Sequence, residues 1–256
     1  MPGKLFYLWR VVATGCCFVL FGLGGLVLRC VLLPIVTMLV PAQQRIAATR
    51  RMIRMSFRLF IAIMQRLGVL RYEIIGRERL ARRGLLILAN HPTLIDTVFL
   101  MAFVEHADCI VKAGLRQNIF TRAAVISAGY AFNNDGAGLM KDCIDSLHHQ
   151  SNLIIFPEGT RTEPDGSLHF KRGAANVAVR AGCDITPVII RCHPQTLGKG
   201  VAWWKIPAQV ATFRIEVLED IPITSFTADG VSDGLAARHL TTYLENYFTQ
   251  GSQRHA

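Results

Sequence analysis

The hydrophobic positions near the N-terminus form two uncharged runs. Residues 11–28 lie between Arg10 and Arg29, and at about 1.5 Å per residue a helix of that length barely crosses a hydrocarbon core of about 30 Å. The next run, residues 30–40, is too short to span a bilayer. From this pattern we interpret residues 5–41 as a membrane anchor.

Two arrangements of this anchor fit the pattern: a single span, or two helices that dip into one leaflet. Arginines flank the apolar runs on both sides, which favours the second arrangement. A cleaved signal peptide is disfavoured, because Arg29 and a second apolar run stand where a small-residue cleavage site would be.

Residues 43–70 have the periodicity of an amphipathic helix. Its apolar positions recur at helical spacing along one face: Ile53, Phe57, Phe60, Met64 and Leu67. Arg51, Arg54 and Arg58 share another face, which is typical of a basic helix at a lipid interface. The alternative is a core helix of the folded domain whose arginines are solvated, and both can hold along different parts of the helix.

Beyond residue 72, strand-like and helix-like segments alternate. The predicted strands are 85–89, 109–111, 153–156, 185–191 and 209–217. The predicted helices are 93–104, 116–127, 137–149, 173–181 and 231–249. This alternation predicts an α/β fold with a mixed, mostly parallel sheet flanked by helices, preceded by an N-terminal membrane-associated helical anchor.

Positive charge is concentrated in the N-terminal part. No acidic residue precedes Glu73, whereas ten basic residues do. The formal net charge of +10 therefore belongs to residues 1–72, and the rest of the chain is neutral. An apolar, basic segment on a neutral domain indicates an anionic membrane surface, whereas a nucleic-acid partner does not need a long apolar stretch beside it.

The seven cysteines are scattered along the chain, and no two of them have the Cys-x-x-Cys spacing of a zinc or redox site. We therefore expect free thiols in a reducing compartment. This expectation places the folded domain in the cytoplasm.

The first candidate for chemistry follows the strand predicted at 85–89. Residues 90–96 read Asn-His-Pro-Thr-Leu-Ile-Asp, so His91 and Asp96 lie past the carboxyl end of a strand, where ligands bind in α/β sheets. The pair can meet if a helix starts near Pro92 with His91 just before it. Asp96 would fix the imidazole tautomer, and the other ring nitrogen could take a proton from a hydroxyl. Alone, such a pair is more often structural.

A second polar segment follows the strand predicted at 153–156. Phe-Pro-Glu-Gly-Thr-Arg-Thr at 156–162 offers the carboxylate of Glu158 and the guanidinium of Arg161, and arginine is well shaped to hold a phosphate. The alternative is a polar turn in which these two side chains pair. Lys171 lies in Phe-Lys-Arg-Gly at 170–173, which opens another helix whose N–H groups would reinforce anion binding.

Together, these two segments resemble the glycerolipid acyltransferase family, typified by bacterial 1-acylglycerol-3-phosphate acyltransferases. The resemblance covers roughly residues 70–220 and rests on Asn-His-x-x-x-x-Asp upstream of Phe-Pro-Glu-Gly-Thr-Arg. Val111-Lys112, the turn at 170–173 and Thr-Pro-Val-Ile-Ile at 186–190 are similar to further blocks of the family.

By this resemblance, His91 deprotonates the hydroxyl of an acyl acceptor, which attacks a thioester carried by coenzyme A or acyl carrier protein, and Asp96 orients His91. Glu158 and Gly159 help to hold the acceptor and the developing oxyanion, while phosphate is bound by basic side chains. The expected substrate-binding residues are Asn90, Lys112, Glu158, Gly159, Thr160, Arg161 and Lys171. No metal, cofactor or covalent acyl-enzyme is implied, since the thioester is already activated.

One position departs from the family. Its second block usually reads Gly-x-x-Phe-Ile-x-Arg, and that arginine contacts the acceptor phosphate. The matching stretch here is Gly-Tyr-Ala-Phe-Asn-Asn-Asp at 129–135, which places Asp135 at the arginine position. Because a carboxylate repels a phosphate, either the acceptor carries less negative charge at that end, or Lys112 and Arg161 hold the phosphate unaided.

The resemblance also sets the expected organisation and surroundings. We divide the chain into an anchor (1–42), a basic interfacial helix (43–72), an acyltransferase domain (73–250) and a flexible tail (251–256). We expect the inner, cytoplasmic membrane, with the catalytic domain facing the cytoplasm. The expected partners are anionic membrane lipids and an acyl carrier protein or coenzyme A thioester, with no nucleic acid.

Three other functions remain open at this point. The enzyme could acylate a specialised lipid of the aryl polyene or amino-lipid type. It could also be a lipid-binding relative without activity, although the intact His91, Asp96, Glu158 and Arg161 argue against that. Hydrolysis of the thioester is the third, and it is distinguished by release of free acid when the acceptor is omitted.

Overall fold

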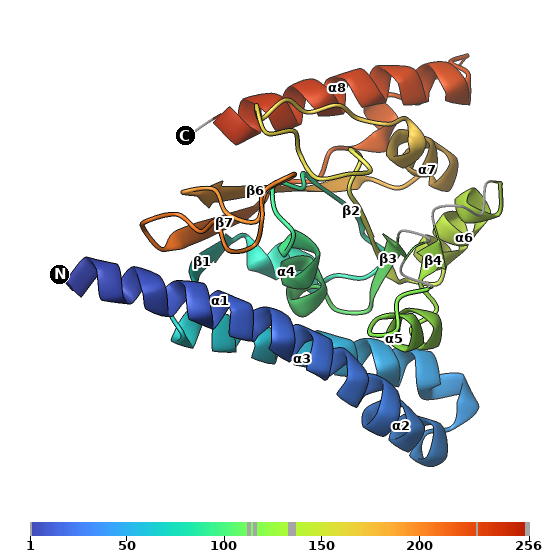
Figure 1. The fold of residues 1–256 in the computed structure, drawn as a ribbon. Helices are drawn as coiled ribbons and strands as arrows, with labels where there is room; N and C mark the ends of the chain where they lie inside the picture. Colours follow the sequence, from blue (N-terminus) through green and yellow to red (C-terminus); the bar gives the residue numbers. More distant parts are fainter. Residues whose placement is uncertain (1, 112–113, 115–116, 133–136, 229, 254–256) are drawn as a thin grey trace.

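A computed structural model describes the chain except for residues 1, 112–113, 115–116, 133–136, 229 and 254–256 (Figure 1). The helices are α1 (Pro2–Val27), α2 (Leu33–Leu39), α3 (Arg45–Arg66), α4 (Asp96–Phe103), α5 (Arg122–Ser127), α6 (Ala137–His148), α7 (Gly173–Ala181) and α8 (Asp233–Gln253). The strands are β1 (Leu70–Ile75), β2 (Leu86–Ala89), β3 (Ala107–Val111), β4 (Ala131–Phe132), β5 (Asn152–Ile155), β6 (Ile185–His193) and β7 (Ala211–Val217).

The described strands form one seven-stranded sheet in the order β1-β7-β6-β2-β5-β3-β4. Neighbouring strands are parallel except for β6 and β7, which are antiparallel. At the centre, Leu86 of β2 pairs with Leu153 of β5 on one side and with Ile185 of β6 on the other. The predicted mixed, mostly parallel sheet is therefore confirmed.

Helices cover both faces of the sheet, and the strands alternate their side chains between the two layers. Ile87 and Ala89 of β2 belong to the core under α3 and α4, whereas Leu86 and Leu88 belong to the core under α6, α7 and α8. Figure 1 shows α8 on one side of the sheet, with α1 and α3 on the other. All four residues of β2 are fully buried, which explains its continuous apolar sequence.

The N-terminal anchor is one continuous helix rather than two. Helix α1 passes through a π-helical segment (Leu28–Leu32) into α2, and within the described residues Lys4–Leu39 is the one helix long and apolar enough to cross a membrane. Only 17% of the most apolar 18-residue stretch of this helix is buried. Pro34 is accommodated near the start of α2, close to the π-helical segment that interrupts the regular hydrogen-bond pattern.

Helix α3 packs into the core of the domain, and two of its arginines form ion pairs rather than being merely solvated. Ile53 and Met64 are buried in the core cluster that includes α4. Arg50 donates to Asp108 at 2.8 Å and Arg54 to Glu105 at 2.7 Å. The core-helix interpretation therefore holds along this face, and a lipid-interface role for the helix stays a prediction.

Several predicted boundaries were wrong. The helix expected to reach residue 70 ends at Arg66, and residues 70–75 form β1, whose one well-buried residue (Leu70) gives a weak hydrophobic signal. The helix expected at 116–127 begins only at Arg122. At the other end of the chain, α8 continues to Gln253, so the predicted tail starts inside a helix. The seven cysteines are free thiols, as expected.

Candidate active site

The two polar segments meet at the carboxyl edge of the sheet. Strands β2 and β5 are parallel neighbours, so the residues that follow Ala89 and Ile155 leave the sheet at the same edge. The backbone N–H of Thr162 donates to the carbonyl of His91 at 2.8 Å, which joins the two loops directly.

The predicted pair is present. Nδ1 of His91 lies 2.9 Å from Oδ2 of Asp96. The expected start of the helix near Pro92 is wrong, because α4 begins at Asp96 and residues 91–95 form a turn. The carboxylate of Asp96 accepts from the N–H of Thr93 at 2.6 Å and from its hydroxyl, which holds that turn. Two side chains five residues apart on one helix would point in different directions, but His91 lies outside the helix, so the pair can meet.

Asp96 is fully buried, whereas the His91 side chain is 17% exposed. Burial raises the pKa of the Asp96 carboxyl above its ordinary value, and hydrogen bonds from His91 and Thr93 oppose that rise. An ionised carboxylate only accepts, so the shared hydrogen belongs to Nδ1 and Nε2 keeps its lone pair. The imidazole also stacks on Phe156, with ring centroids 4.3 Å apart. The ring is therefore fixed in a tautomer suited to a base.

Glu158 holds the two loops together. Its Oε1 accepts from the backbone N–H of His91 at 2.8 Å and from the hydroxyl of Thr162 at 3.1 Å. The side chain is buried, and burial raises the pKa of the Glu158 carboxyl, while the hydrogen bonds from His91 and Thr162 lower it. The pairing of Glu158 with Arg161 considered from the sequence is not formed. These contacts show that Glu158 helps to position His91, and its contact with an acceptor stays a prediction.

Asn90 has a similar supporting role. Its amide nitrogen donates to the carbonyl of Ile190 at 2.8 Å, and its amide oxygen accepts from the N–H of Ile190 at 2.7 Å. Both ends of the buried amide are thus occupied in tying the end of β2 to β6. These contacts give Asn90 a positioning role, and its contact with a substrate stays a prediction.

Gly159 and Lys171 are neighbours at the mouth of the site. Gly159 has a φ of +66°, a conformation that L side chains rarely adopt, and a Cβ built on it would lie 2.9 Å from Nζ of Lys171. The backbone N–H of Lys171 donates to the carbonyl of Pro157. The structure thus brings the Lys171 ammonium to the Phe-Pro-Glu-Gly turn, and Thr160 lies partly exposed beside it.

Arg161 binds a loop to which the sequence assigned no role. Its Nη1 donates to the carbonyls of Leu197 at 3.1 Å and Gly198 at 2.8 Å. The carbonyl of Leu197 also accepts from the N–H of Leu94 at 3.1 Å. This loop contributes backbone carbonyls, which no side-chain pattern reveals, so the sequence carried no signal for it. The predicted residues Lys112 and Asp135 lie outside the described residues.

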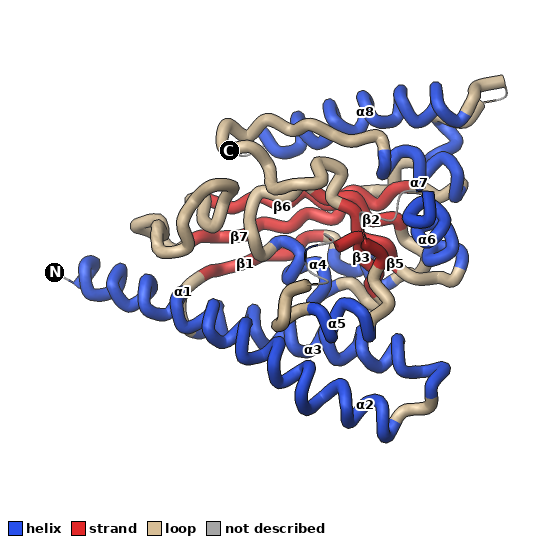
Figure 2. Tube along the Cα trace, turned by 45° about the vertical axis from the view of Figure 1, so that its right-hand side comes forward, coloured by secondary structure: helices blue, strands red, loops and turns tan. Residues whose placement is uncertain are grey.

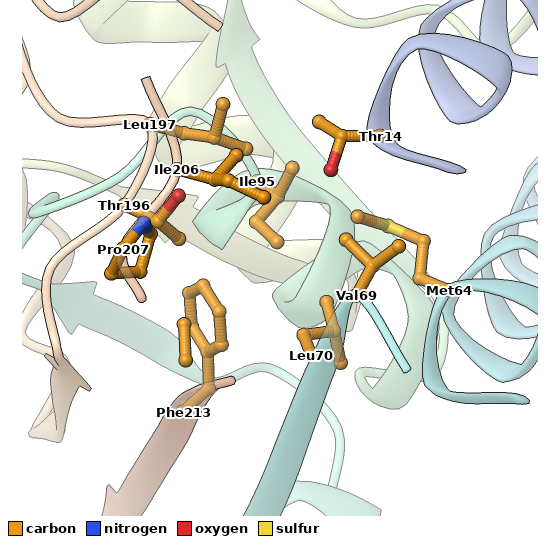
Figure 3. Close-up of a pocket in the computed structure, with 11 residues that line it drawn as sticks. Thr14, Met64, Val69, Leu70, Ile95, Thr196, Leu197, Ile206, Pro207 and Phe213 are labelled. Atoms are coloured by element: carbon orange, nitrogen blue, oxygen red, sulfur yellow. The ribbon is translucent and has the colours of Figure 1, made fainter. Parts of the chain in front are cut away.

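A small apolar pocket adjoins the catalytic turn. Figure 3 shows side chains from α1, α3, β1, β7 and the segments around 95 and 196–207 converging on it. Ile95, next to Asp96, and Leu197, the partner of Arg161, line the side nearest the site. Met64, Ile206 and Phe213 contribute further apolar surface. At about 10 Å³ the pocket has room for about one water molecule, so the polar residues lie beside closely packed apolar side chains.

Comparison with known proteins agrees with this geometry. Residues 71–191 match the family model described as Acyltransferase. The chain is 33% identical over 112 residues to the 1-acyl-sn-glycerol-3-phosphate acyltransferase of Helicobacter pylori, covering 41% of this chain and 47% of that protein. It is 25% identical over 171 residues to 1-acyl-sn-glycerol-3-phosphate acyltransferase alpha of Mus musculus, covering 62% and 58%. The chain therefore spans about half the length of the curated relatives it matches.

A solved structure shares the fold along nearly the whole chain. The crystal structure of the 1-acyl-sn-glycerophosphate (LPA) acyltransferase PlsC from Thermotoga maritima superimposes with a TM-score of 0.71 and covers 99% of both chains. The two sequences are 18% identical, so this likeness concerns the fold alone. It extends to the N-terminal helices as well as to the sheet.

Proposed function

We propose that this chain, whose residues 71–191 match the family model described as Acyltransferase and which is similar to 1-acyl-sn-glycerol-3-phosphate acyltransferases, is a membrane-bound acyltransferase. It moves a fatty acyl group from a thioester to the hydroxyl of a lysophospholipid-like acceptor such as 1-acylglycerol-3-phosphate. The single observation that carries this proposal is the imidazole of His91, held at 2.9 Å by buried Asp96 at the carboxyl edge of the sheet.

The reaction needs one base. Nε2 of His91 takes the proton of the acceptor hydroxyl as the oxygen attacks the thioester carbonyl carbon, and Asp96 stabilises the resulting imidazolium. The tetrahedral intermediate collapses by breaking the carbon–sulfur bond, and the thiolate leaves with the proton that His91 took up. No covalent acyl-enzyme forms, because the acceptor oxygen attacks the donor directly.

The charged end of the acceptor is held by basic side chains around the Phe-Pro-Glu-Gly turn. Lys171 is exposed and lies beside Gly159, within the same turn that carries Glu158. Arg161 uses Nη1 on the Leu197 loop, and a guanidinium has further N–H donors for a phosphate. In this proposal Lys112 adds a third positive charge.

In this proposal the acyl chain lies outside the apolar pocket lined by Ile95 and Leu197, because that pocket, at about 10 Å³, has room for about one water molecule. A phosphate on Lys171 and Arg161 would place the acceptor hydroxyl near His91.

The surroundings follow from the same proposal. The exposed apolar helix Lys4–Leu39 and the positive charge of residues 1–72 support attachment to an anionic membrane, with the catalytic domain in the cytoplasm and the chain in the inner membrane. Either coenzyme A or acyl carrier protein serves as the carrier of the acyl group.

A second candidate function concerns the acceptor. Asp135 stands where the family has a phosphate-binding arginine, which favours an acceptor with less negative charge at that end, such as an amino-lipid or an aryl polyene lipid. The two versions share the base and the donor, and they differ only in the headgroup that the turn accepts.

Purified protein assayed on a panel of lyso-lipids separates these versions. With an acyl-thioester donor, rapid transfer to lysophosphatidate supports the first acceptor and sinks the second. Transfer confined to neutral or amine-bearing lyso-lipids would support the second acceptor and exclude the first. Free fatty acid released without any acceptor would indicate a thioester hydrolase, and acyl transfer to none of the acceptors would favour a lipid-binding relative without activity.

A further inference from the structure

The loop between β6 and β7, residues 194–210, is attached to the active site at its first half. The carbonyls of Leu197 and Gly198 accept from Arg161, and Leu197 also accepts from the N–H of Leu94 in the catalytic turn. Any displacement of this part of the loop therefore moves the partners of Arg161.

The second half of the same loop is fastened to helix α1. Arg10 is 2% exposed, and its guanidinium donates to the carbonyls of Pro207 at 2.8 Å, Ala208 at 2.6 Å and Gln209 at 2.9 Å. Closer to the middle of α1, the ring of Trp203 packs on Phe18, with centroids 5.7 Å apart. In Figure 2 the loop that joins β6 and β7 lies at the end of the sheet nearest the N-terminus of α1.

Between these attachments the loop turns aromatic side chains outward. Trp204 is 54% exposed, and Trp203 beside it is 39% exposed, with the two rings 5.5 Å apart. The loop carries Lys199 and Lys205 and no acidic residue of its own, and Lys199 is paired with Glu163. Its outward surface therefore combines aromatic side chains with the positive charge of Lys205.

We propose that loop 194–210 docks on an anionic lipid bilayer next to α1, with Trp204 at the interface, and that this docking holds Arg161 in the active site. Three observations favour a bilayer over a protein partner. Tryptophan prefers the boundary between hydrocarbon and headgroups. Lys205 complements anionic lipid. The loop also continues the exposed apolar surface of α1, where residues such as Leu20 and Leu23 are exposed.

Fluorescence tests the docking, because the chain has only three tryptophans. In full-length protein carrying Trp9→Phe and Trp203→Phe, Trp204 is the sole reporter. This protein is reconstituted into vesicles of phosphatidylcholine and phosphatidylglycerol whose acyl chains are brominated. The Trp204 emission should be strongly quenched relative to the emission in unbrominated vesicles. The control carries Tyr243→Trp on α8 with all three native tryptophans replaced by Phe. Because α8 lies on the far side of the sheet, its emission should be unchanged.

Equal Trp204 emission in the two kinds of vesicle, with the protein floating with both, would overturn the proposal. The proposal would also be overturned if vesicles left the Trp204 emission unchanged and acyl carrier protein shifted it. That result would assign the surface to a protein partner. Neither result depends on enzymatic activity.

The proposed effect of loop docking on Arg161 rests on the proposed function, and it needs a separate measurement. Trp204→Glu should reduce transfer to a long-chain acceptor embedded in vesicles several-fold and leave transfer to a water-soluble short-chain acceptor less affected. Leu235→Glu, at an apolar position on α8 that is 44% exposed, should change neither rate. Equal rates of transfer to the embedded acceptor for the two variants would refute the effect of docking on Arg161. Absence of transfer in the unsubstituted protein would instead refute the proposed function.

Discussion

Nδ1 of His91 lies 2.9 Å from Oδ2 of Asp96, although the two residues are on opposite sides of a turn that ends where α4 begins. Thr93 supplies two hydrogen bonds to the same carboxylate. The Asp96 side chain therefore has two roles, since it holds its own turn and fixes the imidazole that the turn carries.

Replacing Asp96 with Asn should reduce acyl transfer by about a hundredfold or more, which is the usual contribution of a positioned base. The amide would offer an N–H to Nδ1 and so favour the tautomer with the hydrogen on Nε2, the wrong atom for a base. Steady-state kinetics measures the loss. Asp165→Asn, at an exposed turn, should leave kcat unchanged, and a fully active Asp96→Asn enzyme would show that tautomer control is unimportant.

Glu158→Gln should change how stability depends on pH. Burial raises the folded-state pKa of Glu158 above the unfolded value of about 4.3. The folded state then binds more protons between those two pKa values, so the free energy of unfolding falls as pH rises through that window. Glutamine has no proton to lose and removes this contribution.

Urea unfolding of both proteins from about pH 4 to about pH 8 checks this sign. The stability of the natural protein relative to the Gln variant should decrease with rising pH and then level off above the folded pKa. Parallel curves for the two proteins would contradict the raised pKa. Asp96 titrates in both proteins, so its own contribution appears in both curves, whereas its repulsion of the Glu158 carboxylate is part of the difference.

Gly25→Ala should loosen the packing between α1 and the segment that carries Phe120. A Cβ at Gly25 would lie 2.5 Å from the carbonyl oxygen of Phe120, which is too close for two atoms of the framework, whereas a Cβ at Gly24 meets nothing within 4 Å. We expect a loss of about 1–3 kcal/mol for Gly25→Ala. Gly24→Ala should gain up to about 1 kcal/mol from helix propensity. Chemical unfolding in detergent compares the two, and equal stabilities would contradict this packing.

Arg10→Met should release loop 194–210 from α1. The buried guanidinium serves three carbonyls, and leaving them without a donor should cost about 3 kcal/mol. Trypsin should then cut at Lys199 and Lys205 faster than in the natural protein. Lys4→Met, at an exposed position on the same helix, is the control, and unchanged cleavage of the Arg10 variant would argue against the attachment.

Much of the fold could be predicted from the sequence, because its strands are strongly apolar. The apolar run at 86–89 is fully buried and flanked by helices, so its hydrophobic pattern predicted a buried strand. Strand β1 was missed because its alternating residues follow a helix of similar composition without a marked change. Whether the apolar N-terminus forms one helix or two depends on how the chain accommodates Pro34, which is decided by local backbone geometry.

The candidate site could also be predicted from the sequence only in part. His91 and Asp96 could be identified because their chemistry is in their side chains. The roles of Asn90 and Glu158 in holding backbone groups could not, since the same residue types also bind substrates. The carbonyls of Leu197 and Gly198 are peptide groups that every residue possesses, so only the folded chain shows that they hold Arg161.

The central claim, that His91 is the base of an acyl transfer, is tested most directly by His91→Ala. Transfer of a radiolabelled acyl group from acyl-CoA or acyl carrier protein to the best acceptor of the lyso-lipid panel should fall to background, while circular dichroism and flotation with vesicles stay as in the natural protein. Acyl transfer that persisted at a measurable fraction of the original rate in a folded, membrane-bound His91→Ala protein would contradict this mechanism.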